Sequence, residues 1–332
     1  MNPAKCTAED YINFVIATPR VVTATEAERV QPPQSEKAPA HDAFTRLLTR
    51  LEPDAESLWA ESRSQVDLNR GILILDDSTL EKPYSKRNDL VYRHWSGKQK
   101  EVVSGINLIT LLWTEGDRAV PVDYRIFDKD RDRKTKNDHF SEMLLEAHDR
   151  GFNPAMVCFD SWYGSWENLK LCRSLGWHFL TRLKSNRLVN PDRTGLRAVS
   201  LIEIPEAGRV VWLKDFGLVK VFRIEATDGT TEHWATDMIE MSDLERVKYA
   251  SYSWQIEQYH RGIKQFCLIE RGQMRRRRAW LSHINLCLRA FLRIESHCYR
   301  TGISWFEAKH SIVREAVRAY LANPVYQLFP TA

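Results

Sequence analysis

Residues 71–76 read Gly-Ile-Leu-Ile-Leu-Asp, an apolar run that stops abruptly at an acid. The pattern recurs at residues 154–160, which read Pro-Ala-Met-Val-Cys-Phe-Asp. Short apolar runs of this kind are typical of buried strands, and an acid at the end of such a strand stands at the rim of the sheet. We therefore expect Asp76 and Asp160 to end adjacent strands of one mixed sheet.

A third acid lies in residues 254–264, which read Trp-Gln-Ile-Glu-Gln-Tyr-His-Arg-Gly-Ile-Lys. In a helix, Glu257, Arg261 and Lys264 fall at positions i, i+4 and i+7 and share one face, with Trp254 on the same side. Together with the two strand-end acids, this Glu could surround hard cations with carboxylate oxygens, an arrangement that suits in-line displacement at phosphate. The pattern predicts metal-dependent phosphodiester chemistry, and an exposed helix with a Glu–Arg pair is the competing interpretation.

Basic residues gather directly after this acid, although the net charge of the whole chain is only +4. Against the single acid Glu270, the basic residues of this stretch are Arg261, Lys264, Arg271, Arg275, Arg276, Arg277 and Arg278. A dense positive block lets a polyanion approach carboxylates that would otherwise repel it. These residues, with Trp254, are therefore the predicted nucleic-acid contacts, and a solvated helix face is the alternative.

Composition limits the class of protein. The chain has 332 residues, of which 28% are charged and 11% aromatic, as in a globular protein. The longest apolar stretch, residues 105–113, is too short to span a membrane, and the N-terminus lacks the apolar segment of a secretory signal. We expect a soluble cytoplasmic protein. The six Cys form no CxxC pair, so we expect buried apolar residues and no zinc ribbon or disulfide framework.

Changes in residue composition and in the helix-like or strand-like pattern predict four regions. They are a helical N-terminal region at 1–70 with DNA binding as a candidate role, the first part of an α/β core at 71–184, a β insertion at 185–245, and a C-terminal helical part of the core at 246–332. Strands at 102–114 and 119–127, followed by alternating helices and strands, predict a mixed sheet with helices on its faces. Residues 284–294 are expected to form a buried packing helix.

The motifs resemble those of bacterial DDE transposases of the IS4/IS701-like insertion sequences. The resemblance rests on Leu-Asp-Asp-Ser-Thr (75–79), Cys-Phe-Asp-Ser-Trp-Tyr-Gly (158–164) and the helix at 254–265, with further likeness at 80–84 and 93–98. It implies an RNase H-like core with a β insertion before the last catalytic acid. It also implies cut-and-paste transposition, in which element ends are cleaved and the freed 3′-hydroxyl is joined to target DNA.

The resemblance further implies the site and its partners. Asp76, Asp160 and Glu257 would be the catalytic acids and would bind Mg²⁺, with Mn²⁺ able to substitute. The partner would be double-stranded DNA, as terminal inverted repeats and as target, bound by a homodimer in the bacterial cytoplasm and at the nucleoid, without a membrane. Two alternatives stay open: an RNase H-fold nuclease without strand transfer, and a catalytically silent DNA-binding derivative.

One signature of the IS4 group is incomplete. That signature is Tyr, two residues, Arg, three residues, Glu, six residues and Lys. Glu257 and Lys264 keep the last spacing, whereas Ala250 and Ser253 stand where the Tyr and the Arg are expected. The departure favours an IS701-like branch, with Arg261 as a candidate source of the missing guanidinium.

Two neighbouring residues, Asp76 and Asp77, are candidates for the first catalytic acid. Side chains alternate along a strand, so Asp76 and Asp77 face opposite sides of the sheet and only one can reach the site. Asp76 is favoured because it ends the apolar run in an Asp-x-Ser context, and Asp77 is the alternative. Three competing carboxylates are interpreted as loop acids: Asp123, Asp128 and Asp130.

Overall fold

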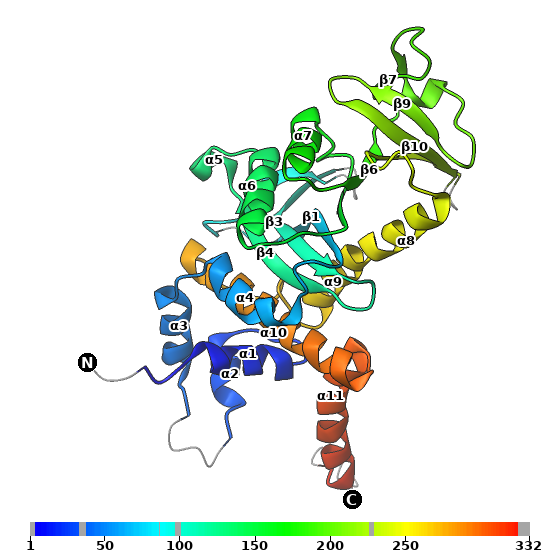
Figure 1. The fold of residues 1–332 in the computed structure, drawn as a ribbon. Helices are drawn as coiled ribbons and strands as arrows, with labels where there is room; N and C mark the ends of the chain where they lie inside the picture. The colour runs from blue at the N-terminus through cyan, green and yellow to red at the C-terminus, as the bar shows by residue number, and fades with distance from the viewer. Residues whose placement is uncertain (1–3, 33–37, 86, 97–100, 226–228, 325–332) are drawn as a thin grey trace, which may run out of the picture. The chain divides into compact units, whose positions relative to one another are not determined.

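The computed structural model describes residues 4–32, 38–85, 87–96, 101–225 and 229–324. The chain divides into two compact units, coloured by residue number in Figure 1. The sheet unit comprises Ala55–Pro83 and Tyr92–His260, and the helical unit comprises Met1–Asp54, Tyr84–Val91 and Arg261–Ala332. Gly97 and Lys98, which end one of the quoted motifs, lie outside the described residues.

One sheet of 11 strands forms the sheet unit, as far as the chain is described. The strands are β1 (Ile72–Glu81), β2 (Tyr92–Ser96), β3 (Glu101–Thr114), β4 (Val120–Phe127), β5 (Met156–Phe159), β6 (Phe179–Leu183), β7 (Leu188–Asn190), β8 (Arg197–Ala198), β9 (Arg209–Leu213), β10 (Gly217–Glu225) and β11 (Thr231–Thr236). Their order is β2-β3-β1-β5-β6-β11-β10-β9-β7-β8, and β4 also pairs with β3.

The core of this sheet has the expected topology. Strand β1 is antiparallel to β3, which is antiparallel to β4, whereas β1, β5 and β6 run parallel. The order β4-β3-β1-β5-β6, with three antiparallel strands followed by two parallel ones, is RNase H-like. The predicted fold class, a mixed sheet flanked by helices, is confirmed.

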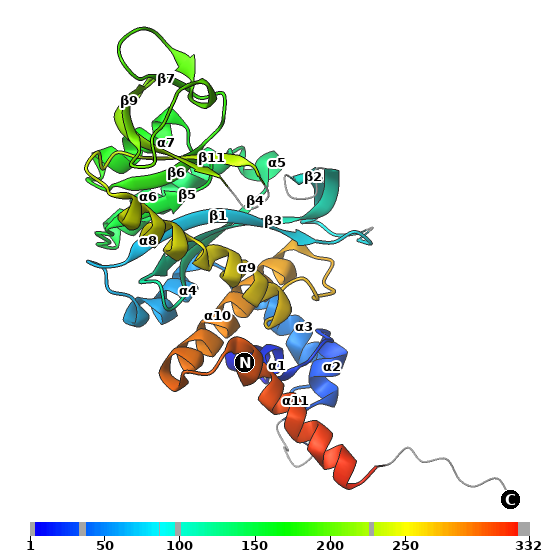
Figure 2. The same cartoon turned by 90° about the vertical axis from the view of Figure 1, so that its right-hand side faces the viewer.

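Helices cover both faces of this core. Those of the sheet unit are α4 (Ala55–Ser62), η1 (Arg63–Gln65), α5 (Lys129–Asp132), α6 (Lys136–Asp149), α7 (Trp166–Ser174), η2 (Val199–Leu201), α8 (Asp243–Ser253) and the first part of α9 (Gln255–Gln265). Helix α6 packs on β3 and β4, whereas α8 packs on β1, β5 and β6 from the opposite face (Figures 1 and 2). Capping boxes begin both helices, at Thr135 and at Ser242, and each cap stabilises by about 1 kcal/mol.

The predicted β insertion lies between β6 and α8 and contains β7 to β11. Strand β11 is antiparallel to β6, with His233 opposite Leu183 and Thr236 opposite Leu180. The insertion therefore continues the core sheet by backbone hydrogen bonds.

The helical unit is built around α10 (Arg277–Thr301), which packs on α1 (Ala8–Ala17) and α3 (His41–Arg50). Its other helices are α2 (Ala24–Arg29), α11 (Trp305–Ala322) and the end of α9. The predicted packing helix at 284–294 lies within α10, where most side chains are buried. Gly302 ends α10 in the left-handed conformation, which glycine adopts without a steric penalty.

Several local predictions need correction. Strand β1 continues five residues past Asp76 because β3 pairs with it as far as Glu81. Strands β2, β7 and β8 and helix α2 were not predicted, since these elements are short and lack a clear apolar period. All six cysteines are free and buried, as predicted. In the described residues, no helix is both long and apolar enough to cross a membrane.

Candidate active site

A pocket of about 360 Å³ in the sheet unit brings the three predicted acids together. Asp76, Asp160 and Glu257 all line it, and we call it the acidic pocket. Its other lining residues are Ile74, Leu75, Cys158, Phe159, Leu180, Arg182, Trp234, Ala250, Ser253, Trp254 and Ile256. Acids that lie far apart in the sequence therefore share one solvent-filled space.

The register of β1 and β5 explains how the two aspartates meet. The last parallel pair of these strands is Leu75 with Phe159. Asp76 and Asp160 are the next residue on each strand, so each is the first residue beyond the parallel pairing. The sequence predicted strand ends here. In the structure, only the β1–β5 pairing ends at this point, while β1 itself continues along β3.

Asp77 points away from the acidic pocket into a network of hydrogen bonds. Its Oδ2 accepts from Asn107 Nδ2 and from Lys136 Nζ, each at 2.7 Å, and its Oδ1 accepts from the Tyr163 hydroxyl at 2.9 Å. Every donor comes from a different segment, namely β3, the start of α6 and the turn after β5. Because Asp76 lines the pocket and Asp77 does not, the geometry selects Asp76 as the candidate first acid.

The two neighbours also differ in proton affinity. Burial raises the pKa of Asp76 well above its usual range, and the carboxylates of Asp77, Asp160 and Glu257 raise it further. Burial also raises the pKa of Asp77, but the Lys136 ammonium and the donated hydrogen bonds outweigh it, so the net pKa is lowered. Asp76 thus holds a proton more readily than an ordinary aspartate, whereas Asp77 is kept ionised by the Lys136 ammonium and its hydrogen-bond donors.

Asp160 begins a tight turn that leads into α7. Its Oδ1 accepts from the backbone N–H of Trp162 at 2.9 Å, and its carbonyl accepts from the backbone N–H of Tyr163 at 3.2 Å and from the Thr181 hydroxyl at 3.2 Å. Burial raises the pKa of Asp160, the Trp162 N–H opposes this change, and the Asp77 carboxylate adds to it. The turn holds the carboxylate at the pocket without neutralising it.

Glu257 lies in the first turn of α9, and the β3–β4 turn fixes the start of that helix. Gln255 Nε2 donates to the carbonyl of Gly116 at 2.9 Å. Gly116 has φ +107°, and a Cβ there would come within 2.3 Å of the Tyr252 ring at the end of α8. Glycine is required at this turn, because a side chain would displace the end of α8 next to Glu257.

Arg182, which the sequence analysis did not single out, also lies at the acidic pocket. Arg182 of β6 lines the pocket, with Nη1 3.0 Å from Glu232 Oε1 and its guanidinium 5.1 Å from the centroid of the Trp234 ring. The small residues Ala250 and Ser253, where the signature has Tyr and Arg, line the same pocket. No motif pointed to Arg182, because its role depends on strand neighbours that are distant in sequence.

His260 is a second residue that the sequence analysis missed. It is buried on α9, and its Nδ1 lies 3.9 Å from Asp76 Oδ2. The separation of three residues from Glu257 is the signal that could have found it, because such residues share a helix face.

The acids of the pocket are not closed into a metal cage. Among the described residues, no group of three His, Cys, Asp or Glu side chains is arranged so that it could hold a metal ion. The donor set nevertheless has the right chemistry, since carboxylate oxygens are the ligands that Mg²⁺ prefers. Burial, and then the repulsion among the carboxylates, raises the pKa of Asp76, and a cation bound by the acids would offset both effects.

The predicted basic block belongs to the helical unit, whereas Trp254 belongs to the sheet unit, where it is exposed and lines the acidic pocket. Within the helical unit, Arg271, Arg275 and Arg276 are exposed. Arg278 instead forms an ion pair with Glu52 and donates to the carbonyl of Leu51 at 3.0 Å. Arg278 therefore holds α10 to the end of α3, and the block divides into exposed and structural members.

Asp123 differs from the prediction of a loop acid. It lies in β4, is completely buried and forms an ion pair with Arg125. Burial raises the pKa of Asp123 to about 6, and Arg125 opposes the change. Asp123 is a core acid that shares the Arg125 guanidinium with Glu146, and it is buried because α4 and α6 pack on β4.

Comparison with protein families gives a match at residues 67–292, to the family described as "Transposase DDE domain". The chain belongs to this family. The match spans the core strands, the insertion, α8 and α9, and it includes Asp76, Asp160 and Glu257. A comparison with curated proteins found no match.

One solved structure has a similar fold. A piggyBac transposase synaptic complex with hairpin DNA is similar, with a TM-score of 0.50 and 13% identity over 100% of this chain and 80% of that one. A Drosophila P element transposase strand transfer complex matches with a TM-score of 0.29 and 14% identity, over 53% of this chain and 37% of that one. The first likeness agrees with the RNase H-like core described above.

Proposed function

We propose that this transposase cleaves the DNA ends of its own insertion sequence and joins the freed 3′-hydroxyl to target DNA. The observation that carries the proposal is the acidic pocket, where the family's expected acids come together from β1, the turn after β5 and α9. An IS4/IS701-like, bacterial origin is part of the proposal and rests on the quoted motifs.

Asp76, Asp160 and Glu257 would hold Mg²⁺, with Mn²⁺ able to substitute. When bound, the metal supplies positive charge that offsets the carboxylate repulsion and stabilises the charge that develops on the phosphate oxygens. The acids act as ligands and take no covalent part. Water is the nucleophile in cleavage and the 3′-hydroxyl in joining, so no protein–DNA bond forms.

Other side chains of the pocket orient the site and the substrate. Gln255 and the Gly116 turn fix the start of α9, and the turn of Asp160 is held by the Trp162 N–H. Arg182 adds a cation at the wall of the pocket, where a phosphate oxygen could bind it. We assign Trp254 and the members of the basic block other than the structural Arg278 as DNA contacts: Arg261, Lys264, Arg271, Arg275, Arg276 and Arg277.

The proposed partner is double-stranded DNA, as terminal inverted repeats and as target, bound by a homodimer. The solved piggyBac complex contains hairpin DNA in a synaptic assembly, which supports a DNA substrate for a chain of the same fold. The basic block supports a DNA partner independently, because it concentrates positive charge in one short stretch of a chain whose net charge is only +4.

The test is a two-stage assay on DNA carrying the inverted repeats that flank the gene. Incubation with Mg²⁺ is expected to cut at the repeat ends, and incubation with a chelator is expected to leave the DNA intact. A labelled, pre-cut end with a free 3′-hydroxyl is then expected to join a target plasmid. Cutting without joining would instead indicate a nuclease, and DNA binding without cutting would indicate a silent DNA-binding derivative.

A further inference from the structure

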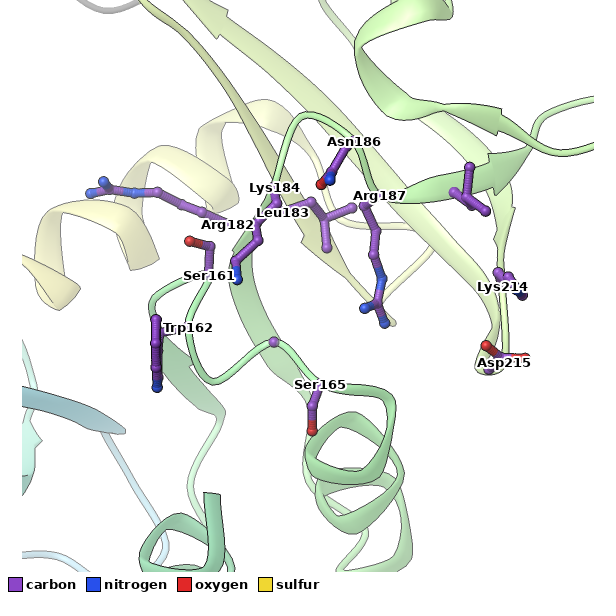
Figure 3. A pocket seen from close by; sticks show the side chains of 12 residues that line it. Ser161, Trp162, Ser165, Arg182, Leu183, Lys184, Asn186, Arg187, Lys214 and Asp215 are labelled. Atoms are coloured by element: carbon purple, nitrogen blue, oxygen red, sulfur yellow. The ribbon is translucent and has the colours of Figure 1, made fainter. Parts of the chain in front are cut away.

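Residues 160–165 form the turn between β5 and α7, which we call the Asp160 turn. One side of this turn borders a second pocket, of about 420 Å³, whose other walls are the end of β6 with the loop that follows it and the β9–β10 turn (Figure 3). The residues of the turn that line this pocket are Ser161, Trp162, Gly164 and Ser165. Tyr163 is not among them, and its side chain is fully buried, at 0% exposure. The Tyr163 side chain therefore points away from the pocket and into the protein.

Contacts with three other elements fix Tyr163 in place. Its ring stacks on Phe140 of α6, with the ring centroids 5.5 Å apart. Its carbonyl accepts from Nδ2 of Asn168 on α7 at 2.9 Å, and Asn168 is itself buried. Its hydroxyl donates to Asp77 Oδ1 on β1 at 2.9 Å, while Lys136 Nζ donates to the other oxygen of that carboxylate at 2.7 Å. Tyr163 thus joins the Asp160 turn to β1, α6 and α7.

The backbone of Tyr163 also contacts the carboxylate of Asp160. The Tyr163 N–H is shared between the Asp160 carbonyl at 3.2 Å and Asp160 Oδ1 at 3.4 Å. The same Oδ1 accepts from the Trp162 N–H at 2.9 Å. Because both donors belong to the turn, a shift of Tyr163 would move the groups that orient the Asp160 carboxylate.

The hydrogen bond between Tyr163 and Asp77 lies just beyond the paired part of β1 and β5. Their parallel pairing ends one residue before Asp76 and Asp160, so the backbone hydrogen bonds of that pairing do not extend to the two acids. Asp77 directly follows Asp76, and Tyr163 is bonded to Asp160. The hydroxyl therefore connects the two chain segments that carry these acids, from the opposite face of the sheet.

We infer that Tyr163 is a positioning residue, whose hydrogen bond to Asp77 sets the place of the Asp160 carboxylate relative to Asp76. The inference rests on the proposed function, in which these two acids are metal ligands. Mg²⁺ demands near-ideal octahedral geometry with oxygens at about 2.0–2.1 Å, so a small displacement of one carboxylate lowers its affinity. Tyr163 acts through Asp160, since it does not itself line the acidic pocket.

The test compares two substitutions that each remove one buried hydroxyl, Tyr163→Phe and Tyr11→Phe. Tyr11 is the matched control, because its hydroxyl also forms a 2.9 Å hydrogen bond, with His283 Nδ1, but belongs to the helical unit and not to the unit that carries Asp76 and Asp160. A purely structural tyrosine would lose stability on either change without any effect on metal binding.

Metal binding is measured by titrating metal-free protein with Mn²⁺ in the absence of DNA, with the free ion followed by electron paramagnetic resonance. Tyr163→Phe is expected to weaken Mn²⁺ binding roughly 10- to 100-fold, which is the usual result when a residue that orients a metal ligand is lost. Tyr11→Phe is expected to bind Mn²⁺ as wild type does.

Amide hydrogen exchange of the metal-free proteins measures the turn itself. The amides of Trp162 and Tyr163 are expected to exchange roughly 10-fold faster in Tyr163→Phe than in wild type, because a hydrogen bond that opposes opening of the turn is lost. The amides of β5 are expected to keep their rate. Tyr11→Phe is expected to leave both segments unchanged.

The outcomes separate this inference from the proposed function. Faster exchange of the turn in Tyr163→Phe, in a protein whose wild type binds no Mn²⁺ and cuts no DNA, would uphold the positioning role and reject the function. Cutting and Mn²⁺ binding by wild type, with the same Mn²⁺ affinity in Tyr163→Phe and Tyr11→Phe, would overturn the inference alone. If Tyr163→Phe fails to fold, Asp77→Ala decides, because it removes the acceptor of the same hydrogen bond, and wild-type exchange of the turn in that variant would overturn the inference.

Discussion

The two faces of β1 hold carboxylates in opposite states. On the α6 face, Asp77 accepts hydrogen bonds from Asn107, Lys136 and Tyr163, and its pKa is lowered. On the α8 face, Asp76 lies among other acids, and its pKa is raised well above the usual range. Adjacent residues with the same side chain therefore differ in proton affinity because of their neighbours alone.

The difference indicates what each face is for. A half-buried carboxylate such as Asp77, with three hydrogen-bond donors, is a structural element that joins separate segments. A cluster of acids that raise one another's pKa costs free energy of folding, and proteins keep such clusters mainly where a ligand or reaction needs them. The α6 face thus supports the fold, while the α8 face carries the acids to which we assign metal binding.

The largest expected effect is on catalysis, from Asp76→Asn and Asp160→Asn. Each change keeps the shape but removes one anionic ligand, so Mg²⁺-dependent cleavage is expected to fall by orders of magnitude while binding of end DNA persists. Cleavage assays and gel shifts on the same samples measure both properties. Full cleavage by either variant would falsify the assignment.

The matched change on the other face, Asp77→Asn, is expected to act on stability. It leaves the Lys136 ammonium without its charged partner and is expected to lower the free energy of unfolding by about 2–4 kcal/mol. Asp76→Asn, by contrast, relieves repulsion and is expected to raise it by about 0.5–2 kcal/mol in metal-free protein. Urea unfolding of both variants makes the comparison, and effects of equal sign would contradict the contrast between the faces.

The pH dependence of stability is expected to separate the same residues. The folded-state pKa of Asp76 is raised, so its protonation stabilises the fold, and stability falls as pH rises from about 4 through that pKa. The folded-state pKa of Asp77 is lowered, so its contribution is present above about pH 4 and is lost as pH falls through that pKa. Thermal melts in a chelator, with each Asn variant as the control for its own residue, measure these slopes.

A smaller effect extends the comparison to the basic block. Arg275 and Arg276 are exposed, whereas Arg278 is paired with Glu52. Changing Arg275 and Arg276 to Gln is expected to lower the salt dependence of duplex binding by about 2 units, since each phosphate contact contributes about 0.9. Arg278→Gln is expected to weaken the fold and to leave this slope less affected. A loss of binding confined to end DNA would show that the pair reads bases.

Much of the core was legible from the sequence because its strands are short apolar runs with acids at fixed places. The runs before Asp76 and Asp160 predicted neighbouring strands, and these strands pair in parallel. The spacing of residues along α6 and α10 predicted helices that the structure contains. The local sequence pattern was enough to predict an element where both faces of a strand, or one face of a helix, are buried, because burial then determines the residue types.

The rest depended on tertiary neighbours. The alternation of side chains along β1 placed Asp76 and Asp77 on opposite faces of the sheet. Which of these faces is covered by α8 depends on packing by elements outside β1, so the sequence of β1 alone could not decide it. Arg182 lies outside every quoted motif, because the residues that define its surroundings come from β11, a strand that is distant in the sequence. The division into units was also not legible, since Tyr84–Val91 leaves the sheet unit and returns.

The pairing of β11 with β6 has a consequence for how this chain can vary in length. Because β11 is hydrogen-bonded to a core strand and leads into α8, a residue gained or lost between β11 and α8 would shift α8 on the sheet, and with it the start of α9, which carries the last acid. The turn at 191–195, between β7 and β8, is mostly exposed and far along the strand order from β6. Insertions there would lengthen the distal hairpin and leave the three acids where they are. Natural variants of this protein should therefore differ most in size at that turn and least between Thr236 and Asp243.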